Sequence, residues 1–290
     1  MRVDVASLLD VRVRRPQRIA ELAAGRSRPA GLVGPTGRLL LVAADHPARG
    51  ALRVGAQPTA MGDRAELLRR LVVALGRPGV DGVLGTADVL EDLLLLGALE
   101  GKVVIGSMNR GGLAGTVFEV DDRFTGCSPS GIEAAGWQGG KMLLRIDPQD
   151  AATVSTLEAC AHAVDGLARR RLMAMVEPFI CTRTEGRLSN DLSPAAVMRS
   201  AGVAAGLGTT SAYTWLKLPV VDDMAAVLEA TTLPVLLLGG EVAADPDSQL
   251  ALWSKALASP SVRGMVVGRS LLFPPDGDVA AAVDATVELL

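Results

Sequence analysis

The chain has 290 residues, of which 49% are hydrophobic, and its formal net charge is −3, from 29 basic and 32 acidic residues. It is long enough to bury one large core, and because no long block of one sign occurs, binding to nucleic acid or to an anionic membrane is not expected. No apolar stretch reaches the roughly 18 residues that span a bilayer, and the N-terminus lacks the apolar core of a signal peptide.

Residues 1–36 are expected to form an N-terminal helical arm that precedes the main domain. A helix is predicted from Pro16 to Ala24, and the glycine and proline of the segment 25–29 end it. A regular pattern begins at residue 37, so the domain boundary is placed there, with residues 37–290 forming the second unit.

In that second unit, short apolar runs alternate with longer amphipathic stretches. Several of the runs are rich in Val, Ile and Leu without polar alternation, which is typical of parallel strands covered on both faces. The eight predicted strands are Leu39–Ala44, Gly82–Leu84, Val103–Ile105, Met142–Ile146, Leu172–Val176, Thr214–Leu218, Pro234–Leu238 and Gly264–Val267.

Helices are predicted between and after the strands, over Asp63–Leu75, Thr86–Leu99, Asp150–Ala168, Ser193–Ala205, Asp222–Ala230, Asp247–Leu257 and Asp278–Leu290. This β-α alternation over about 250 residues favours a (β/α)8 TIM barrel. A doubly wound open sheet is the alternative, weakened because no Gly-x-Gly-x-x-Gly follows the first strand. Residues 107–140 fit the pattern least well and allow only a short helix with long loops.

Lys217 is conspicuous because the chain has 25 arginines but only four lysines. It lies inside an apolar run, where a desolvated lysine can lose its proton and act as a nucleophile, whereas an arginine cannot. A neutral amine beside a carbonyl substrate forms a Schiff base. The alternative is a lysine that is ion-paired or reaches solvent at a strand end.

Other polar residues stand near the carboxyl ends of the predicted strands, which meet at one mouth in a barrel of this kind. Asp45 follows the first strand and Glu177 follows the fifth, while Lys141 precedes the fourth. Lys141 and Arg145, four residues apart, are expected to face the same side of their strand, which is either the barrel interior or the helix layer. Each could have a purely structural role, and His46 is interpreted as a turn or packing residue.

Glycine pairs follow the last two strands. Gly239 and Gly240 come after the seventh, and Gly268 with Arg269 after the eighth. Bare backbone amides at these two places, together with an arginine, predict a phosphate site of the kind common in such barrels. Two tight turns that bind no ligand are the alternative.

Taken together, these residues resemble those of the class I, Schiff-base-forming aldolases of the (β/α)8 superfamily. The resemblance runs from about Leu39 to the C-terminus and is closest to the branch of tagatose 1,6-bisphosphate and sulfofructose phosphate aldolases. It rests on four features: Asp45, the Lys-Met-Leu-Leu-Arg-Ile-Asp segment that begins at Lys141, Glu177 in Val-Glu-Pro, and Lys217 in Leu-Lys-Leu-Pro. The Gly-Gly and Gly-Arg turns match the phosphate motifs of that family.

The resemblance implies a class I aldolase that cleaves a phosphorylated keto-sugar or keto-sugar acid. Lys217 would form the Schiff base, the Lys141 ammonium would favour its neutral form, Glu177 would shuttle protons, and Asp45 would take the hydroxyl proton as the carbon bond breaks. The chain also resembles an aldolase-like family associated with inositol breakdown. Cleavage of 2-deoxy-5-keto-gluconate 6-phosphate to dihydroxyacetone phosphate and malonate semialdehyde is therefore one implied reaction.

Departures from the family pattern bear on the substrate more than on the chemistry. Pro219 follows Lys217 too closely, Arg145 stands where an aromatic residue is usual, and residues 107–140 match poorly. A phosphosugar isomerase or epimerase and a non-catalytic sugar-phosphate-binding barrel are the alternatives.

Cofactor, location and assembly are further expectations. With two histidines and three widely spaced cysteines, neither a metal site nor a disulfide framework is expected, and no cofactor is needed. A cytoplasmic homo-oligomer is expected.

Overall fold

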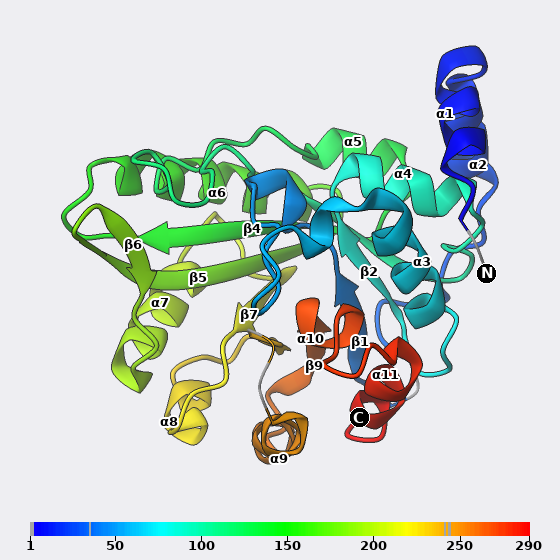
Figure 1. Ribbon diagram of the computed structural model, residues 1–290. Coiled ribbons are helices and arrows are strands. Elements are labelled where there is room, and N and C mark those ends of the chain that lie inside the picture. The colour runs from blue at the N-terminus through cyan, green and yellow to red at the C-terminus, as the bar shows by residue number, and fades with distance from the viewer. Residues whose placement is uncertain (1–2, 35, 241, 243–244) are drawn as a thin grey trace.

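Eight parallel strands close into a barrel, and the predicted TIM-barrel fold is confirmed. The computed structural model describes residues 3–290 except 35, 241 and 243–244 (Figure 1). Around the barrel the strands run β1, β2, β3, β4, β5, β7, β8, β9 and back to β1. Their bounds are β1 Leu39–Ala43, β2 Gly82–Gly85, β3 Val103–Ser107, β4 Gly139–Ile146, β5 Met173–Thr184, β7 Thr214–Leu218, β8 Val235–Leu238 and β9 Val262–Val267.

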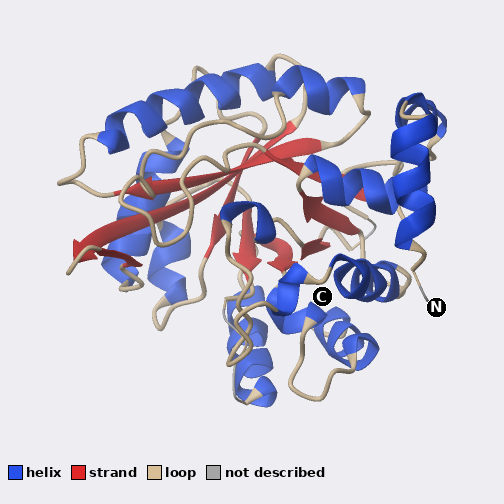
Figure 2. Ribbon diagram, turned by 45° about the horizontal axis from the view of Figure 1, so that its top comes forward, coloured by secondary structure: helices blue, strands red, loops and turns tan. Residues whose placement is uncertain are grey.

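Helices surround the barrel, and a helical pair at one side precedes it (Figure 2). All seven predicted barrel helices are present. The helices are α1 Val5–Arg14, α2 Gln17–Gly25, α3 Arg64–Leu75, α4 Ala87–Leu95, α5 Pro129–Ala134, α6 Ala152–Ala168, α7 Pro194–Ala205, α8 Met224–Glu229, α9 Pro246–Leu257, α10 Arg269–Leu272 and α11 Val279–Val287, with 3-10 turns η1 Pro47–Arg49 and η2 Ala60–Gly62. None of the helices within the described ranges is long and apolar enough to cross a membrane.

Strand alternation sorts the core into two layers. Leu39, Leu41 and Ala43 of β1 pack inside the barrel with residues of the other strands, whereas Leu40 and Val42 pack against the helices. Side chains alternate between the two faces of a strand, so every second residue after Ala43 also points toward the barrel interior. The same alternation applies to β4, β5 and β7. In all four strands, polar residues at odd-numbered positions near the mouth therefore point into the barrel.

Helix α1 and strand β6 (Arg187–Asn190) were not predicted, and neither were the short helix α10 and the turns η1 and η2. Helix α1 begins after Asp4, whose side chain accepts hydrogen bonds from the backbone at its first turn, and Arg12 pairs with Glu91 and Asp92 of α4. These ion pairs tie α1 to α4, and Leu8 is its one buried residue. The division of the chain at residue 36 stays a prediction.

Strand β5 is also longer than predicted, because it continues to Thr184 and pairs with the antiparallel strand β6, Arg187–Asn190. Glu185 and Gly186 join the two strands with φ angles of 50° and 77°. Positive φ at both central residues is the geometry of a tight hairpin turn, which glycine favours and glutamate does not. The hairpin stands beyond the barrel next to the end of β4 (Figure 1).

Candidate active site

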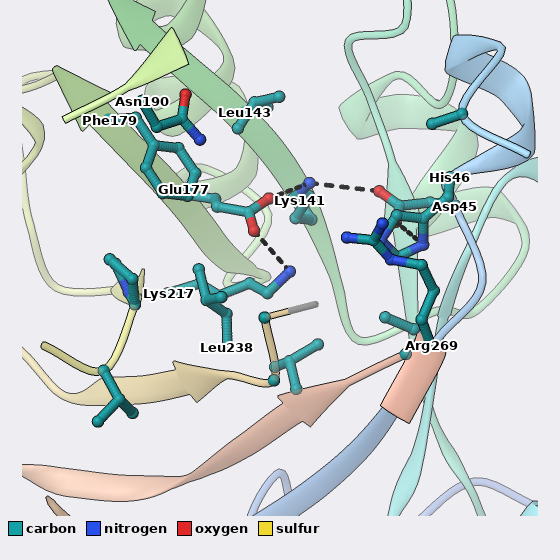
Figure 3. Close-up of a pocket in the computed structure, with 18 of the residues that line it drawn as sticks. Asp45, His46, Lys141, Leu143, Glu177, Phe179, Asn190, Lys217, Leu238 and Arg269 are labelled. Carbon is teal, nitrogen blue, oxygen red and sulfur yellow. Dashed lines mark hydrogen bonds and ion pairs between the residues drawn. The ribbon is translucent and has the colours of Figure 1, made fainter. Parts of the chain in front are cut away.

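The four predicted catalytic residues meet inside the barrel mouth (Figure 3). Lys141 on β4, Glu177 on β5 and Lys217 on β7 share the inward parity of their strands, and Asp45 follows β1. All four are buried, with no more than 8% of any residue exposed. Their convergence follows from the closed barrel, which brings four strands far apart in sequence to one opening.

Ion pairs connect the four side chains in series. Lys217 Nζ lies 2.7 Å from Glu177 Oε1, and Glu177 Oε2 pairs with Lys141. Lys141 Nζ also lies 3.3 Å from Asp45 Oδ2. Lys141 therefore sits between two carboxylates, and Glu177 sits between two lysines.

The pKa values of these groups reflect both burial and pairing. Burial alone would raise the pKa of Glu177, but Lys141 and Lys217 hold it well below its usual range. Burial acts on Asp45 in the same way, and Arg110 and Lys141 outweigh it, so that the Asp45 pKa is also well below normal. Burial lowers the pKa of Lys141 to about 8 even though both carboxylates oppose the shift. Both carboxylates are thus ionised at neutral pH.

Arg110 is a site residue that sequence reasoning missed. It lies in the segment after β3, is only 8% exposed, pairs with Asp45 Oδ2 and donates to Ser107 Oγ at 2.7 Å. Ser107 Oγ in turn donates to Asp45 Oδ2 at 3.1 Å. The sequence did contain a signal for this part of the site: Ser107 is a polar residue at the end of a strand, as Asp45 is just after one. The weak pattern of residues 107–140 obscured it.

Two arginines near the barrel mouth form hydrogen bonds and ion pairs with the segment 108–128. Arg49 of η1 donates to the carbonyls of Asn109 and Gly112 and lies 2.5 Å from Asp122 Oδ2. Arg145 of β4 lies 3.0 Å from Glu119 Oε1. The prediction that Lys141 and Arg145 share a face is confirmed, because both line the interior cavity.

The two glycine turns border the same cavity. Gly239, Gly240, Gly268 and Arg269 all contribute to its wall, at the ends of β8 and β9. Gly268 lies close to the barrel, since a Cβ there would come within 2.7 Å of the Ala43 carbonyl oxygen. Gly240 has a φ of 70°, which a side chain would strain. All eight candidate site residues predicted from the sequence therefore lie around one cavity.

His46 also lines this cavity, in addition to starting the η1 turn. Its side chain is 26% exposed, and its Nδ1 atom is buried without a hydrogen-bond partner among the described residues. Burial lowers the pKa of His46 to about 4, so the imidazole is neutral at physiological pH. The interpretation of His46 as a turn residue was therefore incomplete.

The cavity has a volume of 580 Å³ and a strongly cationic lining. Among the described residues, six cationic side chains and two carboxylates border it: Arg49, Arg110, Lys141, Arg145, Lys217 and Arg269 against Asp45 and Glu177. Asp122 and Glu119, which do not line the cavity, offset the charges of Arg49 and Arg145. In the part of the chain that the structure describes, no cluster of three or more His, Cys, Asp or Glu side chains is arranged to hold a metal ion.

Fold and site together define a TIM barrel with two buried, carboxylate-linked lysines in its mouth. The chain belongs to the Cgl0159-like family, whose model matches residues 37–287. It is 53% identical to Cgl0159 from Corynebacterium glutamicum, whose crystal structure superposes with a TM-score of 0.96 over 98% of this chain and 96% of that chain. A search of curated proteins finds no match.

More distant solved structures share the fold. A Schiff-base-forming fructose-1,6-bisphosphate aldolase is 18% identical, with a TM-score of 0.66 over 93% of this chain and 99% of its own. An archaeal fructose-1,6-bisphosphate aldolase with its catalytic lysine bound to a carbinolamine intermediate is also 18% identical, with a TM-score of 0.66 over 93% of this chain and 98% of its own. At this identity the likeness establishes the barrel, and the resemblance to the tagatose and sulfofructose branch stays a prediction.

Proposed function

We propose that the protein is a class I aldolase that cleaves a phosphorylated keto-sugar or keto-sugar acid through a Schiff base on Lys217. The observation that carries the proposal is the buried series Lys217, Glu177, Lys141 and Asp45 inside a cavity with excess positive charge. Two close ammonium groups disfavour each other, which makes loss of one proton easier for the pair, although the shared carboxylate opposes this effect. The neutral amine is then the nucleophile.

The reaction begins at the substrate ketone. Lys217 Nζ attacks the carbonyl carbon, and Glu177, 2.7 Å from that nitrogen, takes a proton from the nitrogen and passes it to the carbonyl oxygen. A second proton, from solvent, lets the hydroxyl leave as water. Loss of water gives an iminium that accepts the electron pair when the neighbouring carbon–carbon bond breaks. The depressed pKa of Glu177 means that it relays the proton without storing it.

Phosphate is proposed to bind between the glycine turns. Gly239, Gly240 and Gly268 expose backbone at the ends of β8 and β9, and Arg269 adds a guanidinium. After the outer carboxylates offset Arg49 and Arg145, the described lining still carries more cations than anions. This positive charge would attract a phosphate dianion, and holding the phosphate would fix the carbonyl against the amine.

We further propose that the protein is cytoplasmic and that it self-associates. Cleavage of 2-deoxy-5-keto-gluconate 6-phosphate to dihydroxyacetone phosphate and malonate semialdehyde is one reaction that this site would support. This keto-acid has one phosphate and one carboxylate. The phosphate is proposed to bind at the β8–β9 turns, and the carboxylate would point toward Arg110 and Arg145 on the β3–β4 side of the cavity.

Borohydride reduction tests the mechanism directly. With dihydroxyacetone phosphate, fructose 1,6-bisphosphate, tagatose 1,6-bisphosphate and 2-deoxy-5-keto-gluconate 6-phosphate as a panel, we expect a stable mass increase on the tryptic peptide that contains Lys217. Absence of an adduct with every member would reject the Schiff base. Isomerisation without an adduct would indicate an isomerase, and tight binding without turnover would indicate a sugar-phosphate sensor.

A further inference from the structure

His46 is a polar residue of the cavity whose buried Nδ1 atom makes no hydrogen bond to the described residues. Of its side chain, 26% is exposed. Its Cε1 atom approaches Gly268, since a Cβ on that glycine would lie 3.0 Å from it. The ring therefore stands between the Asp45 carboxylate and the proposed phosphate turn.

Asp45 is poorly placed to accept a substrate proton. Its Oδ2 atom already accepts from Ser107 at 3.1 Å, from Lys141 at 3.3 Å and from Arg110. Three donors on one oxygen stabilise the ionised form, which makes the carboxylate a weak base. The other oxygen, Oδ1, faces His46 Nδ1 at 3.9 Å, about 1 Å beyond hydrogen-bond length.

We propose that His46 is the residue that takes the hydroxyl proton during carbon–carbon cleavage, and that Asp45 orients it; this inference rests on the proposed aldolase function. An ionised carboxylate facing Nδ1 favours the tautomer that carries the hydrogen on Nδ1. The lone pair of Nε2 is then free for the substrate. Hydrogen bonds of catalytic groups are commonly long before substrate binds and shorten afterwards, so a gap of 3.9 Å fits a resting dyad.

The proton path balances within the site. The substrate hydroxyl gives its proton to His46 Nε2, the adjacent carbon–carbon bond breaks, and its electron pair forms the enamine on Lys217 while the aldehyde leaves. The imidazolium then returns the proton to the enamine carbon, which regenerates the iminium. Water hydrolyses the iminium and releases the ketone and the free lysine.

Burial and the charges around His46 keep its imidazole neutral, and so able to accept a proton, before substrate binds. Burial lowers its pKa to about 4, Asp45 opposes the shift, and Arg269, Lys217 and Lys141 reinforce it. A phosphate dianion against Arg269 would offset one of these cations, which would raise the pKa of His46 when substrate is bound. The site would then strengthen its base only with the phosphorylated substrate in place.

Dihydroxyacetone phosphate in D2O separates this proton transfer from Schiff-base formation. The wild-type protein should trap this ketone with borohydride and should also exchange one hydrogen on the carbon next to the carbonyl, seen as loss of a proton NMR signal. His46→Asn should keep trapping to within about threefold and lose exchange by about 100-fold or more, because only the acid-base step is removed. His162→Asn, at the only other histidine and exposed on α6, is the matched control and should exchange like the wild type.

Each outcome decides the inference. Exchange at the wild-type rate in His46→Asn overturns it, and so does a wild-type protein that traps the ketone without exchanging it. If His46→Asn loses trapping, His46→Ala with added imidazole decides: restored exchange supports the proton-carrier role, and no restoration overturns it. A wild-type protein that traps no member of the substrate panel would instead reject the proposed function itself.

Discussion

Glu177 Oε1 lies 2.7 Å from Lys217 Nζ, and the other oxygen of the same carboxylate pairs with Lys141. One carboxylate therefore serves two ammonium groups carried by β7 and β4, the strands on either side of β5. Because the two buried ammonium groups lie close together and burial disfavours their charged forms, the cluster is disposed to release a proton, although Glu177 and Asp45 oppose this. This arrangement makes each lysine sensitive to changes in the other.

Lys217→Arg should abolish Schiff-base formation while leaving the fold intact. Arginine keeps a cation beside Glu177 but stays protonated, so it cannot attack a carbonyl. We expect borohydride trapping and turnover to fall by at least about 10³-fold. Lys255→Arg, on the exposed face of α9, should behave like the wild type. Trapping that persists in Lys217→Arg would move the nucleophile to another residue.

The alkaline limb of kcat/KM should report Lys141. Burial lowers the pKa of Lys141 to about 8, and its ammonium is proposed to support the neutral form of the nucleophile and to hold both carboxylates. Activity should therefore decline as pH rises through about 8. In Lys141→Arg the cation persists at every accessible pH, so the alkaline limb should move upward even if the maximum rate falls. A limb unchanged by this substitution would assign it to a different group.

Glu177→Gln should destabilise the protein at neutral pH. It leaves two buried ammonium groups without their shared anion, and breaking such a pair typically costs about 3–5 kcal/mol. The pKa of Glu177 is lowered in the folded state, so its stabilisation is fully present above the unfolded value of about 4.3 and is lost as pH falls below it.

Urea unfolding of Glu177→Gln at pH 7 and at pH 3.5 measures both effects. The difference from the wild type should be large at pH 7 and smaller at pH 3.5. Glu158→Gln, exposed on α6, should change the free energy of unfolding by less than about 0.5 kcal/mol. An equal difference at both pH values would show that the Glu177 charge does not carry the stabilisation.

Arg269→Gln should weaken binding of phosphorylated ligands only. A hydrogen bond to a charged group contributes about 1.5–3 kcal/mol, so KM or Kd for dihydroxyacetone phosphate should rise roughly 10- to 100-fold. Trapping of unphosphorylated dihydroxyacetone should stay at the wild-type level. Arg263→Gln, exposed near the opposite end of β9, is the matched control. Equal loss for both ketones would argue against a phosphate site at this turn.

Local pattern was sufficient for much of the barrel. Strands such as β1 and β9 are continuous apolar runs because the barrel interior and the helices cover both of their faces. The hairpin after Glu177 was missed because residues 185–186 give no strong turn signal, and α1 was missed because ion pairs to α4 fix it in place.

The sequence by itself determined the eight-strand pattern of the barrel, the positions of Lys141, Glu177 and Lys217 on or next to their strands, and the two glycine turns, since all of these depend on short local segments. Only the tertiary structure decided that Glu177 bridges both lysines, that Arg110 secures Asp45, and that His46 faces the cavity with Nδ1 unpaired. Those contacts join strands and loops distant in the chain, and their distances are fixed by barrel closure and by how the segment 108–128 packs across the mouth. No local periodicity encodes such distances.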